Sequence, residues 1–278
     1  MPFRVEAFYH FADLQDPASL QAEALALGAR HALLGTLILA EEGVNGTVAG
    51  SDEATEALLA WLRALPGFAQ LESKRSQATE APFGTFRVKL RPEIVTMRVP
   101  DAQPARGVGT YVEPEAWNAL LRRPDVRVID TRNAFEYQAG HFRNAEDPNT
   151  TTFSQFPAFV AETLRADTQA PVALYCTGGI RCEKATAHLL NLGFSEVYHL
   201  KGGILRYLEL MPPEQSLWEG ECFVFDERVT VTHGVAEGSM TRCRACGCAF
   251  SANHGTAAFP ASARCPDCAK SQSGSLSP

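Results

Sequence analysis

The chain has 278 residues, 45% of them hydrophobic and 21% charged, and this composition excludes a largely disordered, collagen-like or coiled-coil protein. Its length predicts two domains with room for a small appended module. The net charge of −7 argues against a protein that coats nucleic acid along its whole surface, and leaves room for a local basic patch. No apolar stretch approaches the roughly 20 residues that cross a bilayer, and the N-terminus lacks a signal-peptide pattern, so we expect a cytoplasmic protein without a membrane partner.

Residues 1–98 predict an α+β domain with the ferredoxin-like order βαββαβ. Asn45-Gly46 is expected to form the turn of a hairpin, because both residues tolerate positive φ. Ser51 or Asp52 is the expected cap of the second helix. The expected elements are strands over 5–11, 35–44, 47–49 and 85–97 and helices over 20–30 and 52–65.

Residues 99–109 combine Pro and Gly without periodicity and predict a linker to a second domain over 109–212. Strands alternate with helices in this domain, which predicts an α/β fold with a parallel sheet and ligands at the carboxyl ends of its strands. A Cys-rich module over 213–270, beginning with a strand over 222–231, and a disordered tail over 271–278 are expected to follow. The elements expected in the second domain are helices over 115–122, 156–165 and 183–192 and strands over 126–129, 172–175 and 197–200.

Cys176 stands between an apolar strand and a helix, with a glycine-rich turn in between. Such a turn lets successive backbone N–H groups point inward at a helix N-terminus, where they stabilise an anion and lower the pKa of a thiol. The simpler alternative is a buried structural cysteine, which does not need such a turn. We expect Cys176 to be the reactive residue and Arg181 to add a cation. The residues expected to cradle the anion are Thr177, Gly178, Gly179 and Ile180.

This loop resembles the rhodanese domain, whose cysteine carries a persulfide within a six-residue loop. The resemblance covers about residues 109–210. It also rests on Asp130-Thr131-Arg132, Glu136 and Gly140-His141. Asp130 and Glu136 are expected to brace Arg132 and the loop, because carboxylates beside a thiolate would raise its pKa.

Longer strings resemble the bacterial oxygen-dependent tRNA uridine hydroxylases, which convert the wobble uridine, position 34 of certain tRNAs, to 5-hydroxyuridine. The strings are Glu42–Thr47, Cys176–Lys184, Gly202–Ile204 and Gly220–Arg228. The resemblance implies an oxidoreductase with tRNA as partner and molecular oxygen as co-substrate. Cys176 would then act as a thiolate, a persulfide or an oxidised-sulfur carrier, with a sulfur or electron donor as a further partner. No flavin or nicotinamide motif is evident.

Two other functions remain open at this point. One is a rhodanese-type sulfurtransferase that delivers persulfide sulfur, and the other is an RNA-binding module with a non-catalytic rhodanese domain. Phosphatase chemistry is a minor alternative, because Arg181 stands one position too early and the loop is one residue too small for phosphate. Cys182 is expected beside the loop, either resolving an oxidised Cys176 into a disulfide or serving as a packing residue.

A basic strand offers a candidate RNA contact. Six basic and two acidic residues lie between Ser73 and Arg98, a local charge of +4 in a chain of −7. Alternation in a strand would place Arg87, Lys89 and Arg91 on one face, which suits a phosphate track. The alternative is an ordinary solvated sheet face.

Two Cys-x-x-Cys pairs close to the C-terminus predict a structural zinc site. Eighteen residues separate the pairs, which suits a tetrahedral Cys₄ site in a zinc-ribbon-like extension. The module is too polar to bury a core, so the metal would supply its folding energy. Cys248 is a spare thiol and His254 a weaker substitute. The expected ligands are Cys243, Cys246, Cys265 and Cys268.

Overall fold

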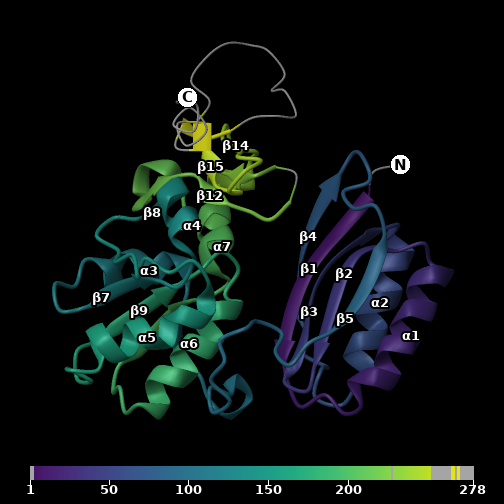
Figure 1. Cartoon of the computed structure of the whole chain (residues 1–278), viewed down its shortest axis with the longest axis horizontal. Coiled ribbons are helices and arrows are strands. Elements are labelled where there is room, and N and C mark those ends of the chain that lie inside the picture. Colours follow the sequence, from purple (N-terminus) through teal and green to yellow (C-terminus); the bar gives the residue numbers. More distant parts are fainter. Residues whose placement is uncertain (1–2, 227, 252–263, 267, 270–278) are drawn as a thin grey trace, which may run out of the picture. The chain divides into compact units, whose positions relative to one another are not determined.

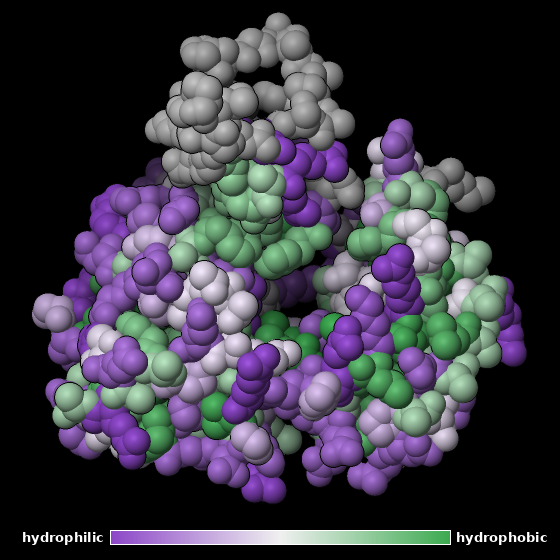
Figure 2. All heavy atoms as spheres, viewed as in Figure 1, coloured by the Kyte–Doolittle hydropathy of each residue, from purple (hydrophilic) through white to green (hydrophobic). Residues whose placement is uncertain are grey.

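The computed structural model describes residues 3–226, 228–251, 264–266 and 268–269. The chain divides into two compact units, Met1–Gly107 and Val108–Pro278, and the boundary falls within the expected linker. Each unit has its own apolar core, and hydrophilic side chains cover much of the molecular face in Figure 2. None of the helices in the described part of the chain is both long and apolar enough to span a membrane. The expected tail over 271–278 and His254 lie outside the described residues.

The first unit is a five-stranded sheet in the order β4-β1-β3-β2-β5, with both helices on one face (Figure 1). The first four strands and two helices have the predicted ferredoxin-like connectivity. Ser51 caps the second helix, because its hydroxyl accepts a hydrogen bond from the Ala54 N–H. The elements are β1 (Phe3–Phe11), α1 (Pro17–Arg30), β2 (Leu34–Ala40), β3 (Gly43–Gly50), α2 (Asp52–Ala64), β4 (Ser73–Ala78) and β5 (Phe86–Leu90).

The hairpin in this unit is real, but the predicted position of its turn is wrong. Ala40 pairs with Gly43, so the two residues between them make the turn, and Asn45-Gly46 lies inside β3. Gly46 is needed there for close packing, since a Cβ would stand 2.8 Å from the Phe8 ring. Asn45 donates its side-chain N–H to the carbonyl of Ile94. The Asn-Gly signal therefore reflects tertiary contacts instead of a turn.

The fourth strand of the ferredoxin-like pattern is β4, which the sequence did not predict. Five of its six residues are polar, and its pairing with β1 places Arg75 opposite the buried carboxylate of Glu6. The predicted strand over 85–97 is shorter, ends at Leu90 and forms an additional edge strand parallel to β2. A polar edge strand gives no hydrophobic alternation, which explains why the pattern pointed to the later segment.

The second unit is built on a four-stranded parallel sheet in the order β6-β10-β9-β7. Its core gathers around Phe142, whose ring contacts Tyr175, Tyr207 and Trp218 edge to face. The elements are β6 (Thr110–Val112), α3 (Pro114–Leu121), β7 (Arg127–Asp130), α4 (Ala134–Ala139), β8 (Gly140–Phe142), α5 (Phe156–Phe159), β9 (Val172–Tyr175), α6 (Ile180–Asn191), β10 (Val197–Leu200), α7 (Gly203–Leu210) and β11 (Trp218–Gly220).

The segment after this sheet differs from the prediction of one strand over 222–231. It forms two short strands, β12 (Cys222–Phe223) and β13 (Thr230–Val231), which pair antiparallel with each other. Asp226 and Arg228 form an ion pair in the turn between them. The apolar run is therefore folded back on itself. Farther along, β14 (Thr241–Arg242) and β15 (Ala249–Phe250) form a second small ribbon.

Gly28 provides a test of packing in the first unit. A Cβ at this buried position of α1 would overlap the ring of Phe86 from β5. Although alanine favours a helix by about 1 kcal/mol over glycine, overpacking a core costs about 1–3 kcal/mol. We expect Gly28→Ala to lower the free energy of unfolding in a denaturant titration. A variant more stable than the wild type would contradict this packing.

Candidate active site and metal centre

Cys176 lies at the carboxyl end of β9, where the chain leaves the parallel sheet. Its side chain is buried, with an exposed fraction of 1%. Gly179 has a φ of 107°, which reverses the chain, and α6 begins at the next residue. The Gly179 N–H donates to the Cys176 sulfur at 3.1 Å. The predicted turn thus places the sulfur at a helix N-terminus, which is a site for an anion.

The surroundings of Cys176 favour its thiolate. Burial alone would raise the pKa of Cys176, but the Cys182 thiol, the Arg181 charge and the Gly179 N–H together lower it to about 6. Cys182 behaves in the opposite way. Burial and the neighbouring Cys176 raise the pKa of Cys182 well above its usual value. The pair is therefore a thiolate that accepts a hydrogen bond from a neutral thiol.

The cation beside the loop is held by a buried carboxylate. Arg181 makes a bidentate ion pair with Glu136 at 2.8 and 3.1 Å, and Glu136 is fully buried. Glu136 also accepts a hydrogen bond from Thr177 and one from the Asn133 N–H, which places it at the start of α4. These contacts fix the direction of the guanidinium relative to the loop.

A second buried ion pair supports the strand beside the loop. Arg132 and Asp130 are both fully buried and pair at 2.6 Å. The guanidinium lies over the rings of Tyr175 and Trp218 and donates to the carbonyl of Gly140. Asp130 therefore braces Arg132, while Glu136 braces the loop through Arg181.

The start of α7 holds the loop from its other side, a contact the sequence did not predict. The N–H groups of Ile204 and Leu205 donate to the carbonyls of Cys176 and Thr177 at 3.0 and 3.1 Å. A Cβ at Gly203 would stand 2.6 Å from those same carbonyl oxygens. The Gly202–Ile204 string noted in the sequence forms this contact. It lies far from Cys176 in the sequence, so the contact could not be predicted from the string alone.

Cys222 is a further thiol, in the apolar core of the second unit. It is fully buried, and burial raises its pKa to about 12 although the charge of Arg132 opposes the shift. Unlike Cys176, it stays neutral. Of Cys176, Cys182 and Cys222, only Cys176 is therefore a thiolate at neutral pH.

The basic strand lies in the first unit. Arg87 is exposed and Lys89 half-buried on β5, while Val88, between them, belongs to the core. Arg91 follows the end of the strand and is exposed. The predicted alternation is therefore present for the first two cations and stops before the third.

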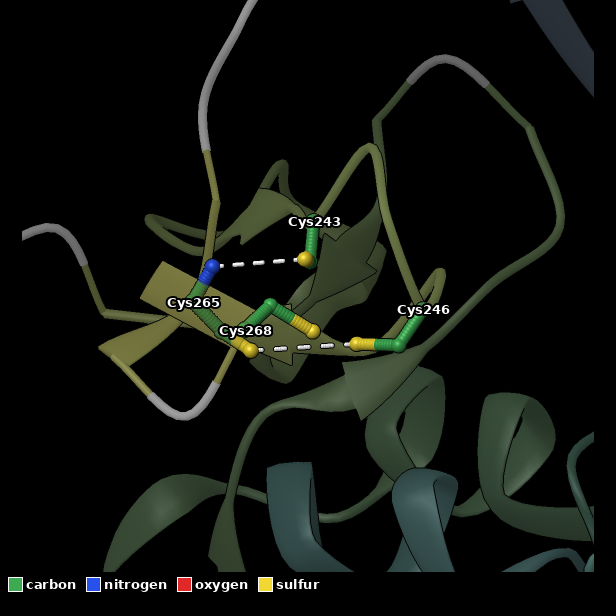
Figure 3. Close-up of side chains that lie close together, drawn as sticks. All are labelled: Cys243, Cys246, Cys265 and Cys268. Atoms are coloured by element: carbon green, nitrogen blue, oxygen red, sulfur yellow. Dashed lines mark hydrogen bonds between the residues drawn. The ribbon is translucent and has the colours of Figure 1, made fainter. Parts of the chain in front are cut away.

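The four predicted metal ligands lie together in the second unit. Figure 3 shows their sulfur atoms pointing toward one another, and all four lie within 4.8 Å of each other. Cys246 and Cys265 are 3.7 Å apart at sulfur. Cys248 also approaches the sulfur of Cys246, at 3.2 Å, but lies outside the group of four. This group can hold a metal ion.

The opposite pKa shifts of the thiol pair predict their alkylation. Iodoacetamide attacks the thiolate, so its reaction with Cys176 should rise with pH through a midpoint near 6. Cys182, whose thiol stays protonated, should remain unlabelled over the same range. Peptide mass spectrometry of the alkylated protein measures both residues at once. A midpoint for Cys176 near the ordinary thiol value of about 8.5 would contradict the described site.

Comparison with known proteins identifies both units. Residues 3–94 match the UPF0176 acylphosphatase like domain, and residues 113–210 match the rhodanese-like domain. Proteins named tRNA uridine(34) hydroxylase are 56% identical in Rhizobium etli, over 88% of this chain and 79% of that protein, and 56% in Deinococcus radiodurans, over 88% and 81%. One from Mesorhizobium japonicum is 52% identical over 96% of this chain and 87% of its own. The chain therefore belongs to the tRNA uridine(34) hydroxylase family.

Proposed function

We propose that this chain hydroxylates C5 of the wobble uridine, position 34, of tRNA in a reaction that consumes molecular oxygen. The relatives are named for this uridine, and their identity to the chain extends over both units. The observation that carries the proposal is the thiolate of Cys176, buried among an N–H donor, a guanidinium and a second thiol. A buried nucleophile with a lowered pKa is typical of a functional site.

Cys182 has a defined role in this proposal. Inserting one atom of O₂ into the C5–H bond leaves a second oxygen atom, which needs two electrons and two protons to leave as water. Closing the thiolate of Cys176 and the thiol of Cys182 to a disulfide releases two electrons and one proton, and the second proton comes from solvent. An external reductant must then reopen the disulfide, so a redox partner belongs to the cycle. Cys182 is thereby a resolving residue and not only a packing one.

Serine variants test the two cysteines separately. Cys176→Ser should abolish 5-hydroxyuridine, because an alcohol of similar size does not ionise at neutral pH. Cys182→Ser should retain the Cys176 thiolate but lose repeated turnover. Mass spectrometry of tRNA nucleosides from a deletion strain carrying each variant measures the product. Near wild-type modification by Cys176→Ser would refute its role, and loss of thiolated bases instead of 5-hydroxyuridine would identify a sulfurtransferase.

Binding of tRNA is assigned to the first unit. Arg87, Lys89 and Arg91 offer three cations close to one sheet edge, and neutralising phosphates releases counterions from RNA. The affinity of the protein for tRNA should therefore fall as the salt concentration rises. Loss of these charges should leave the alkylation of Cys176 unchanged.

The Cys₄ group fits zinc better than it fits a catalytic metal. Zn²⁺ binds thiolate sulfur at about 2.3 Å, and a tetrahedron of that size places its sulfurs about 3.8 Å apart. The 3.7 Å between Cys246 and Cys265 matches this spacing. Four protein ligands leave no position for a catalytic water, so the proposed role is structural: Cys243, Cys246, Cys265 and Cys268 would hold the metal and fix the small ribbon of β14 and β15.

Two matched variants test the ligand set. Cys246→Ser should abolish the one zinc per chain expected from elemental analysis, whereas Cys248→Ser should retain it. Chelation should loosen the ribbon in hydrogen exchange and spare the parallel sheet. Equal zinc loss in both variants would show that Cys248 is a ligand, and absence of zinc from reduced wild-type protein would refute the site.

A further inference from the structure

One face of the five-stranded sheet carries cations and no carboxylate. The face away from α1 and α2, called the open face below, is defined by the pairing register (Figure 1). One row of paired residues crosses all five strands, with Lys74 of β4 at one end and Arg87 of β5 at the other. Lys89 lies on the same face. The three residues between the ends of that row are Ala7, Thr47 and Thr36.

The charges of this unit are segregated between its two sides. The one carboxylate in the five strands, Glu6, points to the helix side, where Arg4 and Arg75 pair with it. The two helices carry four carboxylates, Glu23, Asp52, Glu53 and Glu56, against two arginines, Arg30 and Arg63. In a chain of net charge −7, the strand side chains of the open face are therefore cationic, and the carboxylates of Glu42 and Glu93 hold the segment that contacts this face at Asn45. Such a surface is complementary to a polyanion.

The middle of the open face is uncharged, and its side chains are mostly small. Ala7, Thr47 and Thr36, all half-buried, occupy one row, and Val5, Ala49 and Leu34 occupy the next, in which Ala49 is fully buried. The segment after β5 contacts this face at Asn45, whose side-chain N–H donates to the carbonyl of Ile94. Four strand spacings of about 4.8 Å separate β4 from β5, so the two cationic edges stand about 19 Å apart.

We propose that the open face binds unpaired nucleotides of the tRNA anticodon loop, an inference that rests on the proposed function. The edge cations would hold phosphates, and the part-exposed row of Ala7, Thr47 and Thr36 would take the faces of splayed bases. Unpaired bases present apolar faces, whereas an A-form duplex presents mainly phosphates and 2′-hydroxyls. A strip of this width between two cationic edges therefore fits a single strand better than a duplex. Lys74, on the edge opposite Arg87, extends the contact beyond the basic strand.

Binding of an anticodon stem-loop RNA to the full chain, followed by fluorescence anisotropy, tests the edges. Lys74→Glu and Arg87→Glu should each weaken binding about tenfold and reduce its salt dependence. Arg30→Glu makes the same charge change on the helix side, and should alter binding less than about twofold. Equal losses in Lys74→Glu and Arg30→Glu would overturn the proposal, because the effect would then come from net charge.

A second pair tests the middle of the face. Thr47→Glu should weaken binding about tenfold, since it places a carboxylate among the bases. Thr47→Gln introduces an uncharged side chain of the same size as glutamate, and should retain most of the wild-type affinity. An unchanged melting temperature shows that a variant is folded, and wild-type alkylation of Cys176 shows that its second unit is intact. Wild-type affinity in folded Thr47→Glu would overturn the proposal, as would equal affinity of the wild type for a blunt RNA duplex.

Nucleoside analysis separates this proposal from the function on which it rests. If the wild type forms 5-hydroxyuridine while folded Lys74→Glu and Thr47→Glu bind and modify tRNA normally, the open face is wrong and the function stands. If the wild type restores no 5-hydroxyuridine in a deletion strain, the function itself fails, whatever the stem-loop affinity.

Discussion

A thiolate taken out of water must be stabilised by the groups around it, and the second unit is organised around that requirement. Cys176 is 1% exposed, yet its pKa is lowered to about 6. The Asp130–Arg132 and Glu136–Arg181 ion pairs each have a net charge of zero. With them, the thiolate gives this buried group of residues a net charge of −1. The Gly179 N–H, the start of α6 and the neutral thiol of Cys182 stabilise that charge without adding another ion. The loop is thus built for a monovalent sulfur anion.

The two ion pairs serve different purposes, although both are buried. Breaking a buried pair by removing one partner is strongly destabilising, because the other charge is left uncompensated. Asp130 and Arg132 connect β7 to the aromatic core, whereas Glu136 links α4 to the first turn of α6 through Arg181. The first pair therefore stabilises the sheet edge, and the second sets the field at the sulfur. Only the second contacts the loop after Cys176.

Local patterns predicted the parts of this molecule whose causes are local. The strands over 172–175 and 197–200 have the predicted bounds, because buried parallel strands are continuous apolar runs. The loop after Cys176 and the two Cys-x-x-Cys pairs could also be predicted, because the spacing of their residues indicates what they can bind. The polar strand β4 was not predicted, because its pairing with the distant strand β1 decides it. The turn was misplaced, because Asn45 and Gly46 serve contacts with the distant residues Ile94 and Phe8. The run over 222–231 folds back on itself, which its apolar pattern does not indicate.

The contact between α7 and the loop has a consequence for the direction of the peptide dipoles. A trans peptide is planar, so its carbonyl and the following N–H point in opposite directions. Because α7 fastens the carbonyls of Cys176 and Thr177 on its own side, the N–H groups of Thr177 and Gly178 are turned away from α7. The orientation of these peptide planes is thereby set before any substrate arrives, by a helix that begins 27 positions farther along the chain at Gly203. Reorganisation of the backbone is then not required each time the charge on sulfur changes.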